Sequence, residues 1–190
     1  MRKFDPRHMD RLLSPERRRS QDPDLVLDNL GVVEGMTVAD IGTGPGFFTL
    51  PAARRVGPAG KVYAVDIEPA MLEQVRERAT AEGITNVEAV LSREDRLPLP
   101  TRVVDVALLA DVLHELLEPG KLLEEIARVL KPGGALAVVE WKKEQQEWGP
   151  PLEERLAPEQ AEALLREADF DSFEPFEVGP NHYGILTRNG

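Results

Sequence analysis

Acidic side chains flank a glycine-rich segment in the first third of this 190-residue chain, and their spacing suggests a ligand site. Asp40 precedes Gly42, Gly44 and Gly46, and Asp66 follows twenty residues after the last of these glycines. Glycines at alternate positions let the backbone turn sharply and let a ligand approach without a Cβ in the way. A carboxylate at the end of the next strand can accept hydrogen bonds from two ribose hydroxyls. The combination predicts a site for a cofactor that contains adenosine.

The charge of Asp40 indicates which adenosine cofactor this segment accepts. A dinucleotide would place its pyrophosphate at the glycines, whereas S-adenosylmethionine would place an ammonium and a sulfonium group there. Asp40 repels the first and attracts the second, and Pro45 removes one of the backbone amides that a pyrophosphate would use. We therefore expect S-adenosylmethionine. The alternative role for Asp40 is that of a strand-end carboxylate bonded to the amides of the glycine segment.

A second group of polar residues follows the later apolar segments. His114 comes just after the fourth expected strand, and Glu140 and Trp141 end the fifth. Ligands of an open parallel sheet lie beyond the carboxyl ends of its strands, and the pKa of histidine lies near neutrality. We predict His114 as a general base or acceptor contact, Glu140 as a carboxylate that positions the acceptor and Trp141 as an apolar wall. The alternatives are a histidine that caps the next helix and a strand-end pair that faces solvent, while His182, in the final hairpin, is more typical of a structural residue.

The order of elements predicts the sheet that would bring these residues together. Short apolar segments alternate with segments of helical period, which is typical of a mostly parallel sheet. We expect strands at 38–41, 61–66, 87–91, 103–110 and 135–141, and helices at 24–30, 47–56, 69–82, 122–130 and 158–168. Two last strands, 172–178 and 183–188, are joined by a turn so tight that they must pair antiparallel. The polar segment 142–156 is expected to be an insertion loop over the strand ends, with its tip as a lid.

Three of these segments resemble the class I S-adenosylmethionine-dependent methyltransferases. They are Val38–Gly46 (VADIGTGPG), Val65–Ile67 (VDI) and Arg128–Gly134 (RVLKPGG). The resemblance covers about residues 32–140, and within that superfamily the chain is most similar to the small-molecule branch that includes the ubiquinone/menaquinone C-methyltransferases. The resemblance implies a three-layer, Rossmann-like α/β fold with a seven-stranded, mostly parallel sheet, helices on both faces and an antiparallel final hairpin strand. It also implies methyl transfer to a small molecule.

The resemblance assigns individual residues to parts of the cofactor. It places Asp40 and Gly42 at the methionine end, Gly44 and Gly46 against the sugar and chain, Asp66 on the ribose and Ile67 on the adenine face, and Thr43 is expected to bind the cofactor as well. After the third strand the family usually has Gly-Asp-Ala, whose aspartate reaches the adenine amino group, but this chain has Ser92-Arg93-Glu94-Asp95. Glu94 or Asp95 is expected to replace that acid, with Glu94 favoured. A solvated loop is the competing interpretation.

Composition limits the partners that this chain can have. The formal charge of -11 disfavours nucleic acid as a partner, because such binding needs a basic surface. The chain has no cysteine, and its three histidines lack metal-ligand spacing, so we expect no metal site. No apolar run reaches the roughly 18 to 20 residues of a membrane span, so we expect a cytoplasmic protein without membrane insertion. The sequence does not predict the oligomeric state.

Residues 31–190 are expected to form one domain, preceded by a basic segment and helix in residues 1–30. Residues 1–19 carry seven basic and three acidic side chains, a difference of +4 beside an acidic body. We predict that this segment folds over the cofactor site as a flap, with Arg17, Arg18 and Arg19 as contacts; a solvated tail is the alternative.

Two other functions stay open at this point. A cofactor site proves binding and not transfer, so the chain can be a non-catalytic S-adenosylmethionine-binding protein. An NAD-dependent oxidoreductase shares the glycine segment and the ribose acid, but its Gly-x-Gly-x-x-Gly form, without a preceding acid, is absent from this sequence.

Overall fold

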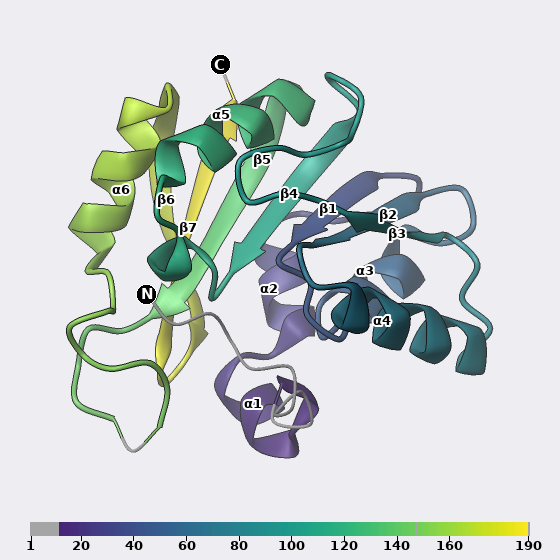
Figure 1. The fold of residues 1–190 in the computed structure, drawn as a ribbon, viewed down its shortest axis with the longest axis horizontal. Helices are drawn as coiled ribbons and strands as arrows, with labels where there is room; N and C mark the ends of the chain where they lie inside the picture. The colour runs from purple at the N-terminus through teal and green to yellow at the C-terminus, as the bar shows by residue number, and fades with distance from the viewer. Residues whose placement is uncertain (1–11, 147, 190) are drawn as a thin grey trace.

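A computed structural model describes residues 12–146 and 148–189, in which seven strands form one sheet (Figure 1). The strands are β1 (Thr37–Ile41), β2 (Lys61–Asp66), β3 (Val87–Leu91), β4 (Val104–Ala110), β5 (Leu130–Trp141), β6 (Phe170–Gly179) and β7 (His182–Asn189). Their order across the sheet is β3-β2-β1-β4-β5-β7-β6. The first five strands pair in parallel, and β7 lies antiparallel between β5 and β6. The predicted fold class is confirmed.

Six α-helices surround this sheet in the described ranges: α1 (Pro15–Ser20), α2 (Pro23–Asn29), α3 (Thr49–Val56), α4 (Pro69–Ala81), α5 (Pro119–Val129) and α6 (Pro158–Glu167). All except α3 have proline in the first turn, where the missing backbone N–H has no helical partner to lose. One core cluster packs α5 and α6 against the sheet, and a second packs α2 and α3 against it with other strand residues. Alternate strand residues point to opposite faces, which gives three layers. No helix of the described ranges is long and apolar enough to cross a bilayer.

The strand β5 begins five residues earlier than the sequence predicted. Leu130 already pairs with Val104, and the register then shifts between Val104 and Val106. Gly133 accommodates the irregularity with a φ of +72°. The helix α5 therefore ends at Val129, and the Pro-Gly-Gly segment lies inside the strand instead of separating the two elements.

The carboxyl ends of β1, β2, β4 and β5 lie at one edge of the sheet because these strands are parallel. The chain order reverses between β1 and β4, which is where open α/β sheets bind ligands. The short helix α1 lies at this edge (Figure 1). The candidate site residues lie at this edge or in a loop beside it.

Candidate active site

The glycine loop, residues 42–46, leaves β1 and bonds first to the neighbouring strand. The amides of Gly42 and Thr43 both donate to the carbonyl of Val65, at 2.8 and 3.0 Å. Gly42 has a φ of +73°, and a Cβ there would lie 2.3 Å from Cγ2 of Val112. Glycine is therefore required at this position both by the backbone conformation and by the close approach of the loop after β4.

The other two glycines of the loop face different neighbours. Gly44, with a φ of +54°, has only Leu12 near the place of a Cβ, at 3.5 Å. A Cβ on Gly46 would lie 2.8 Å from Cδ1 of Leu50, so this glycine serves the packing of α3 against the loop. The roles of these glycines in cofactor binding remain predictions.

Asp40 is buried behind the glycine loop and holds it together. Its Oδ2 accepts hydrogen bonds from the hydroxyls of Thr43 and Thr49, at 3.0 and 2.5 Å. Burial raises the pKa of Asp40 to about 6, although the two hydroxyls and the nearby Arg17 oppose this shift. The geometry thus matches the loop-bonding alternative for Asp40, with hydroxyls instead of amides as donors. Its charge still contributes to the potential of the site.

Asp66 ties the end of β2 to the glycine loop. One carboxylate oxygen accepts from the amide of Gly44 at 2.8 Å, and the other from the amide of Glu68 at 2.9 Å. Burial raises the pKa of Asp66. Each oxygen has a second lone pair, so the carboxylate can still accept hydroxyl groups.

The residue after this carboxylate is apolar and exposed. Ile67 has 41% of its surface exposed, although it directly follows a buried strand. A carboxylate with free lone pairs next to an exposed apolar side chain fits a ribose and the flat face of an adenine. The residues at this edge therefore fit the adenosine part of the expected cofactor.

The two acids predicted for the adenine amino group have other partners. Glu94 accepts a hydrogen bond from the amide of Leu117 at 3.1 Å, which ties the loop after β3 to the segment after β4. Asp95 forms two hydrogen bonds with Arg93, at 3.0 and 2.8 Å. An adenine contact by either acid remains a prediction.

His114 and Glu140 form a buried pair at the ends of β4 and β5. Nδ1 of His114 lies 2.7 Å from Oε2 of Glu140, and the amide of His114 donates to Oε1 at 3.1 Å. Burial opposes the charged imidazolium, but the hydrogen bond and charge of Glu140 outweigh it and raise the pKa of His114. Because Glu140 and Trp141 are both buried, the alternative that they form a strand-end pair facing solvent is wrong. The arrangement fixes the ring and leaves Nε2 as the nitrogen that can exchange a proton with a ligand.

Asp111, which sequence reasoning missed, is the centre of a second polar cluster. Its Oδ2 accepts from Nη2 of Arg17 at 3.1 Å and from Nε2 of Gln21 at 3.0 Å, and its Oδ1 lies 3.3 Å from Nε2 of His182 without hydrogen-bond geometry. Burial opposes the ionised form, but His182, Arg17 and Gln21 outweigh it and lower the pKa of Asp111 to about 2. Its φ of +59° is uncommon for a residue other than glycine. An acid directly after a buried strand was the available sequence signal.

The helix α1 brings one arginine of the basic segment into this cluster. Besides Asp111, the guanidinium of Arg17 contacts the side chain of Gln21 at 2.8 Å and the carbonyl of Leu12 at 3.1 Å. It also lies 4.3 Å from the ring centre of Phe47, next to the glycine loop.

The neighbouring arginines of α1 point away from the site. Arg18 and Arg19 are exposed and pair with Asp24 and Glu16. The other basic residues of the predicted flap, Arg2, Lys3, Arg7 and Arg11, lie outside the described residues.

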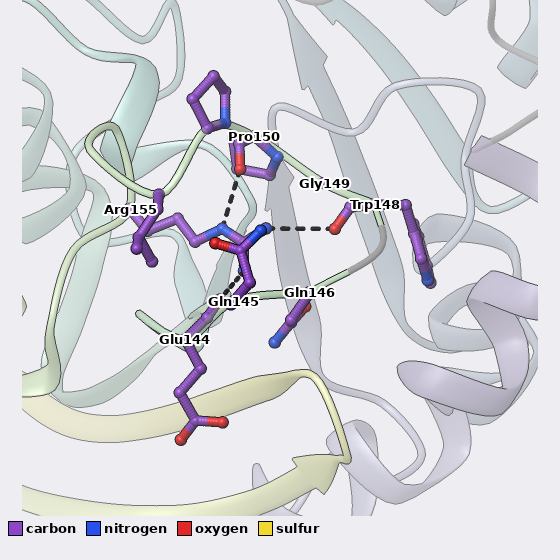
Figure 2. Close-up of a pocket in the computed structure, with 9 residues that line it drawn as sticks. Glu144, Gln145, Gln146, Trp148, Gly149, Pro150 and Arg155 are labelled. Carbon is purple, nitrogen blue, oxygen red and sulfur yellow. Dashed lines mark hydrogen bonds between the residues drawn. The ribbon is translucent and has the colours of Figure 1, made fainter.

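The insertion loop, residues 142–156, is organised by Arg155, a residue that no sequence pattern singled out. Figure 2 shows its guanidinium among the backbone carbonyls of the loop. It donates to the carbonyls of Lys142, Glu144, Trp148 and Pro150, at 3.1, 2.8, 3.2 and 2.9 Å. Burial lowers the pKa of Arg155.

The same loop packs on the end of β5 through aromatic rings. The ring of Trp141 meets that of Trp148 edge to face at 5.0 Å, and it also lies 4.1 Å from the ring of His182. The insertion loop therefore lies against the strand end that carries Glu140.

Comparison with known proteins agrees with this geometry. A model described as "Methyltransferase domain" matches residues 33–170. The ubiquinone/menaquinone biosynthesis C-methyltransferase UbiE of Salmonella arizonae is 39% identical over 118 residues, which are 62% of this chain and 47% of that protein. The chain thus spans about half the length of the curated relatives it matches.

Solved structures share the whole fold. A SAM-dependent methyltransferase from Aquifex aeolicus is 40% identical, with a TM-score of 0.95 over 99% of this chain and 100% of that one. The 4+2 cyclase SpnF has a TM-score of 0.74 at 23% identity, over 88% of this chain and 79% of its own. The second likeness is one of fold alone.

Proposed function

Because the chain belongs to the methyltransferase-domain family, as the match over residues 33–170 shows, we propose that it transfers a methyl group from S-adenosylmethionine to a small organic acceptor. The observation that carries the proposal is the glycine loop bracketed by two carboxylates, Asp40 behind it and Asp66 beside it. Asp66 and Ile67 would hold the adenosine part of the donor. The negative charge of Asp40 would favour its cationic methionine end.

Bound at this edge, S-adenosylmethionine would supply a methyl group already activated on a positively charged sulfur. The task left to the protein is to hold an acceptor in line and to remove a proton where the acceptor carries one. His114 is the residue that we assign to the proton. Glu140 holds the imidazole through Nδ1, so that Nε2 faces the acceptor, and stabilises the imidazolium that forms.

A small acceptor is favoured by charge. The formal charge of -11 opposes binding of nucleic acid. The Salmonella relative is named for C-methylation in quinone biosynthesis, which supports a small organic acceptor for this chain as well. The proposal includes a cytoplasmic reaction, in line with a composition that has no cysteine for disulfides.

The first experiment is calorimetric titration with S-adenosylhomocysteine and, separately, with NAD. Binding of S-adenosylhomocysteine but not of NAD is expected. Binding of NAD alone would overturn the proposal in favour of an oxidoreductase.

The second experiment tests transfer itself, because the likeness to SpnF, named a cyclase, illustrates that this fold does not fix the reaction. Protein and labelled S-adenosylmethionine are incubated with cell-extract fractions, and labelled products are sought by mass spectrometry. A labelled small molecule is expected. Donor binding without a methylated product in any fraction would favour the non-catalytic alternative.

A further inference from the structure

The backbone amides of the glycine loop are already used by the protein. Gly42 and Thr43 donate to Val65, Gly44 donates to Asp66, and Gly46 donates to the carbonyl of Thr43. Pro45 has no amide hydrogen. These loop amides therefore offer little to a carboxylate, although the methionine part of S-adenosylmethionine carries one.

The side chains around the loop make the same carboxylate harder to accommodate. Asp40, Asp66 and Asp111 attract ammonium and sulfonium groups but repel an anion. A donor carboxylate at this edge needs a cation beside it, and Arg17 lies there partly buried, with 11% of its side chain exposed.

Arg17 has the geometry for this task. A guanidinium has five N–H donors, and three of those of Arg17 have partners in the described residues, namely Gln21, Leu12 and Asp111. Stacking on the ring of Phe47 holds the group next to the glycine loop. Its planar fork suits a carboxylate better than a point charge would.

We propose that Arg17 exchanges one carboxylate partner for another when the donor binds. Its guanidinium would break the ion pair with Asp111 and bind the carboxylate of the donor's methionine part instead. This inference rests on the proposed function and adds a recognition residue to it. In the structure described here the guanidinium is held by Asp111, at 3.1 Å. The same ion pair that keeps α1 docked thus competes with the donor.

The exchange would also change the acceptor side of the site. Asp111 lies between Arg17 and His182, and its Oδ1 has no hydrogen-bond partner in the described residues. Once Arg17 has moved, Asp111 keeps Gln21 and His182 as neighbours but loses the positive charge of the guanidinium. Donor binding would therefore prepare a carboxylate close to His114, and the donor would bind before the acceptor.

The test compares two ligands that differ by the amino-acid part. S-adenosylhomocysteine carries the carboxylate, whereas 5′-methylthioadenosine has the adenosine and sulfur without it. Arg17→Gln is expected to weaken the affinity for S-adenosylhomocysteine by about 10- to 100-fold, as for the loss of a charge-assisted hydrogen-bond pair. The affinity for 5′-methylthioadenosine should change by less than about twofold. Arg18→Gln, on the exposed face of the same helix, is the matched control and should change neither.

The results separate this inference from the proposed function. A wild-type protein that binds neither ligand would refute the proposed function. A wild-type protein that binds both, with Arg17→Gln weakening them equally or not at all, would refute the role of Arg17 alone.

A second variant tests the exchange by its sign. Asp111→Asn removes the competing charge while keeping the shape of the side chain, so Arg17 is freer to meet the donor. We expect tighter binding of S-adenosylhomocysteine by a few-fold, and no change for 5′-methylthioadenosine. Unchanged or weaker binding of S-adenosylhomocysteine, in a variant whose thermal unfolding is still cooperative, would overturn the exchange.

Discussion

Asp66 serves the fold and the proposed ligand with the same two oxygens. It already accepts the amides of Gly44 and Glu68, so its position is fixed before any ligand arrives. Asp66→Ala should therefore weaken the affinity for S-adenosylhomocysteine at least about tenfold, since a hydrogen bond to a charged group contributes about 1.5 to 3 kcal/mol. Calorimetry measures the affinity, with the exposed acid Glu73→Ala as control. An unchanged affinity in a folded Asp66→Ala protein would refute the ribose assignment.

His114 and Glu140 allow a prediction that a merely structural pair would not meet. His114→Ala should lower the transfer rate by roughly 10² to 10⁴ while the affinity for S-adenosylhomocysteine stays within about twofold. Since Glu140 is what raises the pKa of His114, Glu140→Gln should move the rise of the rate with pH to a lower pH. Rate–pH profiles of the wild type and of Glu140→Gln check this. Identical profiles would mean that the proton leaves by another route.

At the residue scale, the sequence predicts contacts between residues that follow neighbouring strands. It does not predict contacts that depend on how separate elements pack. His114 and Glu140 were selected because each follows a buried parallel strand, and the sheet brings them together. The ion pair of Arg17 with Asp111 joins residues 94 positions apart and depends on where a six-residue helix docks. No local pattern specifies that docking.

Among the elements, two strands of the parallel part of the sheet were the easiest to predict. The bounds of β2 and β3 match the expected segments, because β-branched and apolar residues end there at acidic or polar ones. The helix α1 was not predicted, although Ser14-Pro15-Glu16 is a local signal for a helix start: the hydroxyl of Ser14 accepts the amide of Arg17 at 3.2 Å. The insertion loop was predicted from its polar composition, but its organisation had no local signal, because four of its carbonyls converge on the single side chain of Arg155.

The docking of α1 depends on a glycine in the last hairpin. A Cβ on Gly179 would lie 2.2 Å from the carbonyl oxygen of Ser20, at the end of α1. Gly179→Ala should therefore displace α1 and weaken the affinity for S-adenosylhomocysteine several-fold, although the glycine loop itself is unaltered. Hydrogen exchange of residues 14–21 should rise in parallel.

The control for this variant is Gly133→Ala. Gly133 also has a positive φ, of +72°, but nothing lies within 4 Å of a Cβ there. Gly133→Ala therefore carries a penalty for a positive φ without a clash. Equal losses of binding in the two variants would show that strain, and not the docking of α1, explains the result.

At the scale of the whole molecule, the site concentrates charge that the fold must tolerate. Asp40, Asp66 and Glu140 are buried and Asp111 is partly buried at one edge of the sheet, inside a chain of formal charge -11. Ligand sites commonly trade stability for function in this way. The sequence showed these acids but not their burial, which comes from the helices and loops that cover the edge.

The pH dependence of stability follows from the direction of each pKa shift. Burial raises the pKa of Asp40 from 3.8 to about 6, so its stabilising contribution is complete below its unfolded value and is lost as the pH rises through about 6. The raised pKa of His114 acts in the same direction, with loss as the pH rises above 6.5. The pKa of Asp111 is lowered from 3.8 to about 2, so its contribution to stability is present above pH 3.8 and is lost only as the pH falls toward 2.

We therefore expect the free energy of unfolding to fall between pH 5.5 and pH 8 by on the order of 1 kcal/mol, with repulsion among the net negative charges adding to the loss. Urea unfolding at several pH values measures it. Asp40→Asn should flatten the profile, because an amide at this position has no charge to bury but can still accept from Thr43 and Thr49. The variant should then be more stable than the wild type at pH 8 and bind S-adenosylhomocysteine less well. A wild-type stability that rises from pH 5.5 to pH 8 would contradict the assignment of Asp40 as a buried carboxylate that destabilises the fold at neutral pH.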